Sequence, residues 1–190
     1  KIDFLDMYDE AYSALKTVIP NAKIIAPGIN FGKMKFDANG NVINNSENDE
    51  NIRWDYSVIN INKLFSTRCQ KFDYVDAHLY HTVDSIPGRI KWLKKTMQNN
   101  NCIKPIYSTE IAGPNPPPNS SLYQQYQNDI SLYNEAQKAD MQIRIPLAIN
   151  NGVQVVIWFH FQDLSSTGEY GITLLKNYGV IDVNGNPDPA

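Results

Sequence analysis

The fold of this chain is decided by the stretch KPIYSTE at residues 104–110, which is followed by a loop that begins with IAGP at 111–114. Apolar and β-branched residues that run into a loop predict a short buried strand. That strand would deliver the carboxylate of Glu110 to its carboxyl end. In parallel α/β proteins, chemistry is carried by residues at the carboxyl ends of strands. Glu110 is therefore the first candidate for a catalytic group.

The composition is that of an ordinary globular protein with one domain. The chain has 190 residues, of which 42% are hydrophobic and 19% charged, and its net charge is −3. A chain of this length can bury a sizeable core. The charges form no long run of one sign, which argues against nucleic acid or an anionic membrane surface as a partner. No segment approaches the roughly 20 apolar residues of a membrane span.

The metal-binding residue types are few and scattered. Cys69 and Cys102 are the only cysteines, and no CxxC pair occurs, so a thiolate metal site is disfavoured. They form either one disulfide or two buried thiols. The histidines are His78, His81 and His160, without an HExxH motif. We therefore expect neither a metal nor another cofactor.

The hydrophobic pattern alternates between helix and strand. The expected helices cover 2–18, 52–68 and 87–98, and a longer one runs from Ser120 or Ser121 to 150, with a kink at Pro146. The expected strands cover 23–28, 72–80, 104–110 and 153–159, and a long polar loop spans 29–51. This alternation predicts a parallel sheet with right-handed crossovers.

Two architectures fit such a sheet: a doubly wound open sheet, or part of an eightfold barrel. An open sheet that binds nucleotides usually carries a glycine-rich turn after a strand. Neither GxGxxG nor GxxxxGK[ST] occurs in the chain, and this absence favours the barrel.

The strand ends, taken together, resemble a known family. The motifs are Ala26-Pro27-Gly28, His78-Leu79-Tyr80, Thr109-Glu110, Trp158 and the closing phrase GVIDVNGNPDPA at 179–190. In this order they resemble the later strands of the retaining glycoside hydrolases with (β/α)8 TIM barrels, the clan of cellulases, mannanases, β-xylosidases and β-glucosidases. The resemblance implies that residues 1–190 are the carboxyl-terminal half of such a catalytic domain, with strands five to eight.

The resemblance also assigns roles to single residues. Glu110 falls at the position of the nucleophile, Tyr80 at that of the tyrosine that hydrogen-bonds it, and Trp158 at that of the aromatic platform under the sugar. His78, His81 and His160 follow or end strands and are expected near the substrate. The chemistry agrees, since a phenol can hold a carboxylate in its charged form and an indole face suits the C–H side of a sugar.

One part of the pattern is missing. The clan places its acid/base Glu after an Asn at the end of the fourth strand, whereas Asn134-Glu135 lies inside the expected long helix. Glu169 is the one substitute to consider. A retaining mechanism needs a second carboxyl group about 5–5.5 Å from the nucleophile. The resemblance thus implies a carbohydrate-binding fragment that is weak or inactive without a missing amino-terminal half, or that associates with itself, and that is secreted.

Other interpretations of the same residues remain. Glu110 could pair with Arg89 or Lys104, Tyr80 could be a core aromatic, and Trp158 could serve packing alone. For the whole chain, the alternatives are a non-catalytic carbohydrate-binding relic or a self-contained open-sheet α/β binding domain.

Overall fold

Four strands and five α-helices make up the part of the chain that the structure, a computed structural model, describes: residues 4–31, 34–43, 51–80, 82–116, 120–163, 179–182 and 184–187, with side chains omitted for 51–59. The helices are α1 (Phe4–Val18), α2 (Asn51–Arg68), α3 (Ile86–Asn99), α4 (Ser121–Asn128) and α5 (Ile130–Asn150). The strands are β1 (Ile29–Asn30), β2 (Val75–His78), β3 (Ile106–Ile111) and β4 (Val153–Trp158). Short 3-10 helices follow α2 (Cys69–Lys71) and precede α3 (Val83–Ser85).

The four strands form one parallel sheet in the order β1-β2-β3-β4, which confirms the predicted α/β class. This order never reverses, whereas a doubly wound sheet reverses at a switch point. Right-handed crossovers that always step in the same direction place every helix on the same face of the sheet. The arrangement is therefore that of consecutive strands in a barrel wall.

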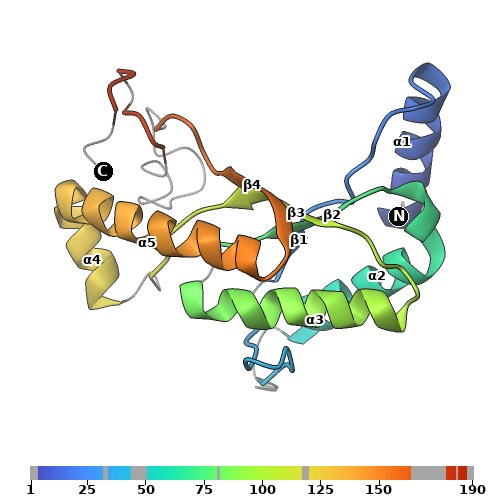
Figure 1. Ribbon diagram of the computed structural model, residues 1–190, viewed down its shortest axis with the longest axis horizontal. Coiled ribbons are helices and arrows are strands. Elements are labelled where there is room, and N and C mark those ends of the chain that lie inside the picture. The colour runs from blue at the N-terminus through green and yellow to red at the C-terminus, as the bar shows by residue number, and fades with distance from the viewer. Residues whose placement is uncertain are drawn as a thin grey trace.

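The main core lies between the sheet and helices α2, α3 and α5 (Figure 1). The sheet contributes buried residues that alternate along its strands, such as Val75, Ala77 and Leu79 on β2 and the residue after it. The helices contribute the following buried residues: Ile61, Leu64 and Phe65 from α2, Ile90, Leu93 and Met97 from α3, and Ala148 from α5.

The opposite face, which we call the open face, is covered by none of the described helices. Tyr74 and Tyr107 stack on one another there, with ring centroids 4.4 Å apart. On β4, Val155 pairs with Tyr107 and Ile157 is 51% exposed. Parallel sheets are normally covered on both faces. We therefore expect the apolar part of the open face to pack against another segment or another chain.

The first strand lies later in the chain than the pattern at 23–28 predicts. Ile25 forms only an isolated bridge to Tyr74, and regular pairing begins where Ile29 meets Ala77. Between the two bridges lies Pro27, which has no N–H to give to a ladder. The prediction of a continuous strand there was wrong for this reason.

The expected polar loop at 29–51 contributes to the core as well. Phe31 and Phe36 are buried and lie edge to face, with ring centroids 5.9 Å apart, and both contact Trp92 of α3. The guanidinium of Arg89 lies over both phenylalanine rings. The overall polarity of the segment concealed these few aromatic residues.

The expected long helix is two helices that meet at Asp129. This residue has an extended backbone (φ −136°, ψ 95°), and its carboxylate accepts the N–H of Leu132 at 3.0 Å as the N-cap of α5. Ser120 caps α4 in the same way through the N–H of Tyr123. An aspartate at an N-cap satisfies a donor that the first helical turn leaves open, which favours a new start there. Helix α5 continues through Pro146 to Asn150.

A disulfide joins Cys69 to Cys102, which decides between the two alternatives left by the sequence. It ties the first residue of the 3-10 helix after α2 to the segment that leads into β3. The link lies near the amino ends of β2 and β3, away from Glu110.

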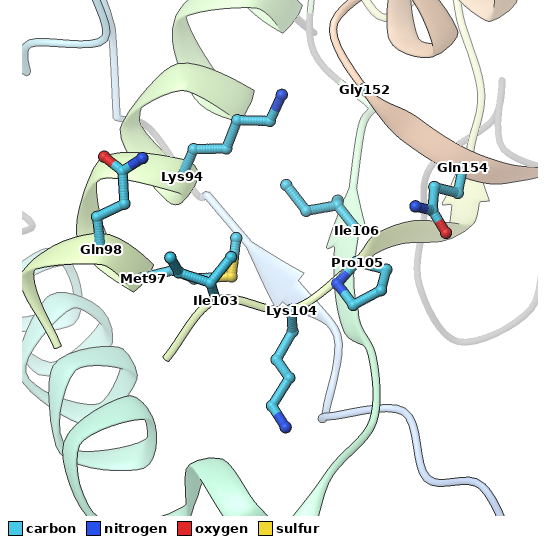
Figure 2. A pocket seen from close by; sticks show the side chains of 9 residues that line it. All are labelled: Lys94, Met97, Gln98, Ile103, Lys104, Pro105, Ile106, Gly152 and Gln154. Carbon is cyan, nitrogen blue, oxygen red and sulfur yellow. The ribbon is translucent and has the colours of Figure 1, made fainter. Parts of the chain in front are cut away.

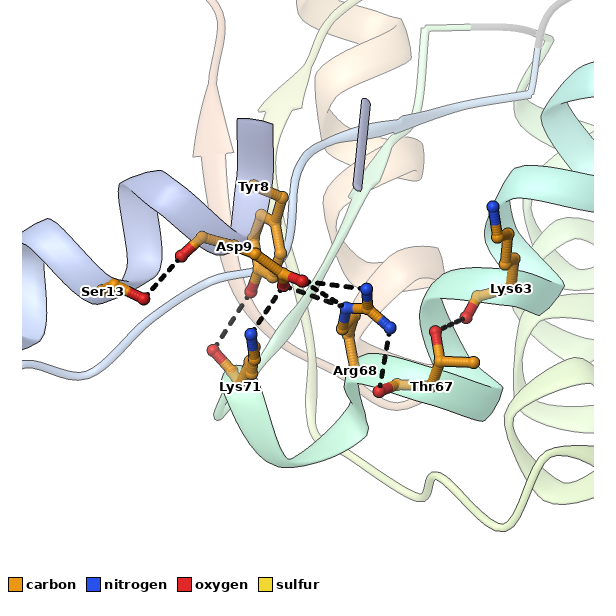
Figure 3. Close-up of polar contacts among 7 residues, drawn as sticks. All are labelled: Tyr8, Asp9, Ser13, Lys63, Thr67, Arg68 and Lys71. Atoms are coloured by element: carbon orange, nitrogen blue, oxygen red, sulfur yellow. Dashed lines mark hydrogen bonds and ion pairs between the residues drawn. The ribbon is translucent and has the colours of Figure 1, made fainter. Parts of the chain in front are cut away.

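Helix α1 is attached through a cluster of polar contacts (Figure 3). Asp9 accepts hydrogen bonds from Arg68 at 2.9 Å and from Lys71 at 2.7 Å, and the hydroxyl of Tyr8 donates to the carbonyl of Lys71 at 3.1 Å. Leu5 is the buried apolar residue of this helix. Other apolar residues of α1 stay exposed, namely Phe4, Met7, Leu15 and Val18.

Candidate active site

The site forms where β2 and β3 end side by side. On β2, Val75, Ala77 and Leu79 face the helices, so the residues between them, Asp76 and His78, face the open side. Tyr80 is the second residue after the end of β2. All three of Asp76, His78 and Tyr80 are spaced by two residues, which puts them on one side of the chain.

A β-bulge turns Glu110 toward the same side. Asp76 pairs with Tyr107 and Leu79 pairs with Ile111, so β3 uses four steps where β2 uses three. The extra residue breaks the alternation: Ser108 and Ile111 are buried on the helix side, while Thr109 and Glu110 both turn to the open face. Bulges re-aim side chains in this way near active sites.

The Glu110 carboxylate receives two polar contacts on one oxygen. The hydroxyl of Tyr80 donates to Oε2 at 2.6 Å, and Nδ1 of His78 lies 3.2 Å from the same atom. The side chain is 35% exposed. Within the part of the chain that the structure describes, Oε1 accepts no hydrogen bond. One oxygen is thus held and the other can meet an incoming atom.

Tyr80 is itself fixed on several sides. Its ring contacts His78 edge-on at 6.1 Å and Phe159 at 5.9 Å between centroids. It packs against a second apolar cluster that contains Ala112 and tyrosines of α4 and α5. The side chain of Asn115 donates to the Tyr80 carbonyl. The hydroxyl therefore reaches Glu110 from a rigid support.

His78 is enclosed between Asp76 and Glu110. Its Nε2 lies 3.2 Å from Oδ2 of Asp76, and a Cβ on Gly28 would stand 2.0 Å from the same nitrogen. Burial by itself lowers the pKa of His78, but the hydrogen bond and charge of Asp76 and the charge of Glu110 outweigh it, so the pKa is raised above its ordinary value of 6.5. For Asp76, burial by itself raises the pKa. The hydrogen bonds with His78 and Thr109 outweigh burial, so the pKa of Asp76 is lowered below its ordinary value.

An arginine braces the loop that follows Glu110. Arg144 of α5 is fully buried, forms an ion pair with Asp140, and donates to the carbonyl of Leu79 at 2.8 Å. A Cβ on Gly113 would stand 2.3 Å from its Nη2, so the loop can approach only because residue 113 is glycine. This contact connects α5 with the ends of both β2 and β3.

The structure brings Glu110, Tyr80 and His78 into contact, and Trp158 pairs with Ile111, the residue after Glu110. Trp158 is half-buried and packs against both apolar clusters. His160 lies next to Phe159, with ring centroids 4.8 Å apart. The predictions for His81 and Glu169 lie outside the described residues.

Neither cation that could have neutralised Glu110 contacts it. Arg89 donates to Ser85 and to the carbonyl of Met34, each at 3.0 Å. Lys104 lies over the ring of Phe72.

Phe159 and Asp76 lie at the site but were not predicted from the sequence as site residues. Phe159 contacts Tyr80, and Asp76 contacts His78. The spacing D-x-H-x-Y at 76–80 was a usable signal for Asp76, because every second residue of a strand faces the same way. Phe159 left no such signal, since its apolar neighbours are typical of any buried strand.

A pocket of about 390 Å³ lies at the other end of the sheet (Figure 2). The end of α3, the segment before β3 and the start of β4 line it through Lys94, Met97, Gln98, Ile103, Lys104, Pro105, Ile106, Gly152 and Gln154. The ammonium groups of Lys94 and Lys104 point in opposite directions. Lys94 already donates to the carbonyl of Asn151 at 2.7 Å. The polar groups that line the pocket therefore do not converge on a common point.

Among the described residues, no group of three or more His, Cys, Asp or Glu side chains could hold a metal ion. None of the helices among them has the length and apolar character to cross a membrane.

Comparison with known proteins gives a distant structural similarity. No family model and no curated protein sequence matches the chain. Among solved structures it is similar to the exo-β-1,4-mannosidase Op5Man5 from Opitutaceae bacterium strain TAV5, with 13% sequence identity and a TM-score of 0.47. The match covers 95% of this chain and 29% of that protein. The chain thus spans less than a third of the protein it matches.

Proposed function

We propose that the chain carries the nucleophile of a retaining glycoside hydrolase, and that Glu110 is this nucleophile. The observation that supports the proposal is the carboxylate of Glu110, with Oε2 contacted by Tyr80 and His78 and Oε1 open. A carboxylate that attacks needs one oxygen fixed and the other accessible. The carboxyl edge of a parallel sheet is also where such groups are found.

The mechanism follows from this geometry. An oxygen of Glu110 forms a bond with the anomeric carbon while the glycosidic C–O bond breaks, and the departing oxygen takes a proton from a general acid. Water then hydrolyses the glycosyl ester and releases Glu110. The phenol of Tyr80 holds the carboxylate throughout. In this proposal Trp158 and the histidines at 81 and 160 contact the sugar.

We propose that the general acid comes from another part of the protein. Among the described residues, Asp76 is the carboxylate that shares His78 with Glu110, but it is 5% exposed and its oxygens face Thr109 and His78. We propose that an amino-terminal half of the barrel, or a second copy of the chain, provides the acid and covers the open face. The exposed residues Val155 and Ile157, together with Met7 and Val18 of α1, support this part of the proposal.

Labelling of the nucleophile tests the proposal directly. The chain is incubated with 2-deoxy-2-fluoro glucosides, mannosides and xylosides that carry a dinitrophenyl leaving group, and its intact mass is measured. Such a leaving group needs little acid help, so the reaction can proceed without the missing acid. We expect one glycosyl adduct, mapped to Glu110 by peptide sequencing.

The controls separate catalysis from binding. Glu110→Gln should lower the labelling rate at least 1,000-fold, about 4 kcal/mol. Glu135→Gln, on an exposed position of α5, should leave it unchanged. An adduct on another residue would overturn the assignment of Glu110. Sugar affinity that survives Glu110→Gln, without any adduct on the wild-type chain, would favour a carbohydrate-binding protein without turnover.

Sedimentation velocity tests the need for a partner. The chain alone should associate with itself in a concentration-dependent manner, because uncovered apolar surface of this kind is costly in water. A monomer at all concentrations that turns over a natural polysaccharide would contradict the proposed partner.

We also propose that the protein is secreted. The Cys69–Cys102 disulfide supports this, since disulfides persist in oxidising compartments.

A further inference from the structure

Asp76 occupies an unusual place behind the candidate nucleophile. It is 5% exposed, and its carboxylate meets three donors rather than solvent. Oδ1 accepts the backbone N–H of Thr109 at 2.9 Å, and Oδ2 accepts the Thr109 hydroxyl at 2.5 Å. The third contact is Nε2 of His78 at 3.2 Å. A buried carboxylate is retained only when its lone pairs are satisfied in this way.

The contacts with Thr109 act on the bulge. Because β3 has one residue too many between its two pairings with β2, the N–H of Thr109 has no place in the regular ladder. The carboxylate of Asp76 accepts this N–H instead. On the other side, the hydroxyl of Ser108 donates to the carbonyl of Ala77 at 2.6 Å. Two side chains thus replace ladder bonds at the point where Glu110 is turned to the open face.

The contacts with His78 act on the charge of the site. Both ring nitrogens lie 3.2 Å from a carboxylate oxygen, Nε2 from Asp76 and Nδ1 from Glu110. An ionised carboxylate can only accept, so both nitrogens must carry a proton for both contacts to be favourable. The backbone of Gly28 lies against the ring, so close that a Cβ there would stand 2.0 Å from Nε2.

We propose that Asp76 is a positioning residue for Glu110: it keeps His78 as an imidazolium facing the nucleophile and holds the β3 bulge that aims it. Only the catalytic meaning of this role rests on the proposed function. The protonation of His78 and the geometry of the bulge can be measured without any substrate.

The neighbours of His78 determine the expected pH dependence. Among the described residues, the titratable groups that face it are Asp76 and Tyr80 from its own chain segment and Glu110 from β3, while Gly28 contributes backbone. The pKa of His78 is raised, so the imidazolium's contribution to stability is fully present below the ordinary value of 6.5 and is lost as pH rises through the folded value. The two ion pairs therefore weaken on the alkaline side.

Nitrogen-15 NMR of the full chain tests the proposal. The ring signals of His78 are assigned with His78→Gln and followed from acid to alkaline pH. We expect both ring nitrogens to be protonated at about pH 7, where an unperturbed histidine is mostly neutral. In Asp76→Asn the midpoint should fall by about one pH unit or more. Asp73→Asn, which removes a carboxylate paired with Lys23, should leave it unchanged.

The outcomes are distinct. A neutral His78 at about pH 7 in the wild-type chain would overturn the proposal, whether or not Asp76→Asn folds. If it folds, labelling of Glu110 should fall about tenfold or more, and the alkaline limb of the labelling profile should move to lower pH. An unchanged profile in Asp76→Asn would also overturn the proposal. Absence of wild-type labelling together with a protonated His78 would contradict the glycosidase function and leave the role of Asp76 on His78 intact.

Discussion

The two ends of the sheet differ in what their polar groups do. At the carboxyl end, polar side chains form one continuous chain of contacts, from Asp76 through His78 and Glu110 to Tyr80. At the amino end a pocket of about 390 Å³ exists, but its lysines point apart. Convergence of polar groups, rather than the size of a cavity, therefore distinguishes the candidate site. In a barrel fold, the amino end serves stability and the carboxyl end serves chemistry.

Reduction of the disulfide should destabilise the amino end of the sheet and leave the candidate site intact. Cys69 and Cys102 are 33 residues apart, and opening a loop of that length costs about 3–4 kcal/mol of unfolding free energy. Urea unfolding of the oxidised and reduced chain would measure the loss. The rate of Glu110 labelling in the folded, reduced chain should stay within about twofold of the oxidised value. A large fall in that rate would show that the two ends are coupled.

Replacing Tyr80 by phenylalanine should have the converse effect. The variant loses a 2.6 Å hydrogen bond to a carboxylate, and such bonds to charged groups are worth about 1.5–3 kcal/mol. Labelling of Glu110 should therefore slow about 10- to 100-fold. Tyr12→Phe on α1, far from the site, is the matched control and should label normally. Equal labelling by Tyr80→Phe and wild type would remove Tyr80 from the site.

Two glycines give the smallest and most direct comparison. In Gly28→Ala, the new Cβ would stand 2.0 Å from Nε2 of His78, so the ring must move and labelling should slow about tenfold. In Gly152→Ala, at the amino end, a backbone φ of +94° becomes strained, and the unfolding free energy should fall by about 1–2 kcal/mol. Labelling by Gly152→Ala should be normal. The labelling rate and the denaturant-induced unfolding of both variants would be measured. A slower labelling rate in Gly152→Ala, or a normal one in Gly28→Ala, would contradict the comparison.

Much of the fold was accessible from local pattern. The expected helices at 52–68 and 87–98 agree closely with α2 and α3, and the strand at 153–159 with β4. The break at Asp129 was also encoded locally, as an N-cap, but the continuous periodicity on both sides concealed it. The candidate site was partly accessible too. The resemblance of the strand ends pointed to Glu110 and Tyr80, whose contact the structure contains.

The sequence by itself determines features whose partners are a few residues apart. The clearest case is the pattern D-x-N-G-N, which occurs at 37–41 and again at 182–186. In both places the aspartate Oδ1 accepts the N–H groups two and four residues later, each at 2.8 Å. The glycines have φ of +77° and +85°. The same pattern makes the same hydrogen bonds in two different surroundings, because the N–H groups that each aspartate carboxylate accepts lie within the pattern itself.

Only the tertiary structure decided the pairings between distant segments. The bulge at Thr109 exists because β3 is out of step with β2, and no pattern within residues 104–110 contains that mismatch. The Cys69–Cys102 bond and the place of Asp76 behind His78 likewise depend on which strands lie side by side. Hydrophobic periodicity tells which face of a strand is buried, but the register of neighbouring strands sets which side chains meet. The register between β2 and β3 therefore directs Glu110 to the open face, beside Tyr80 and His78.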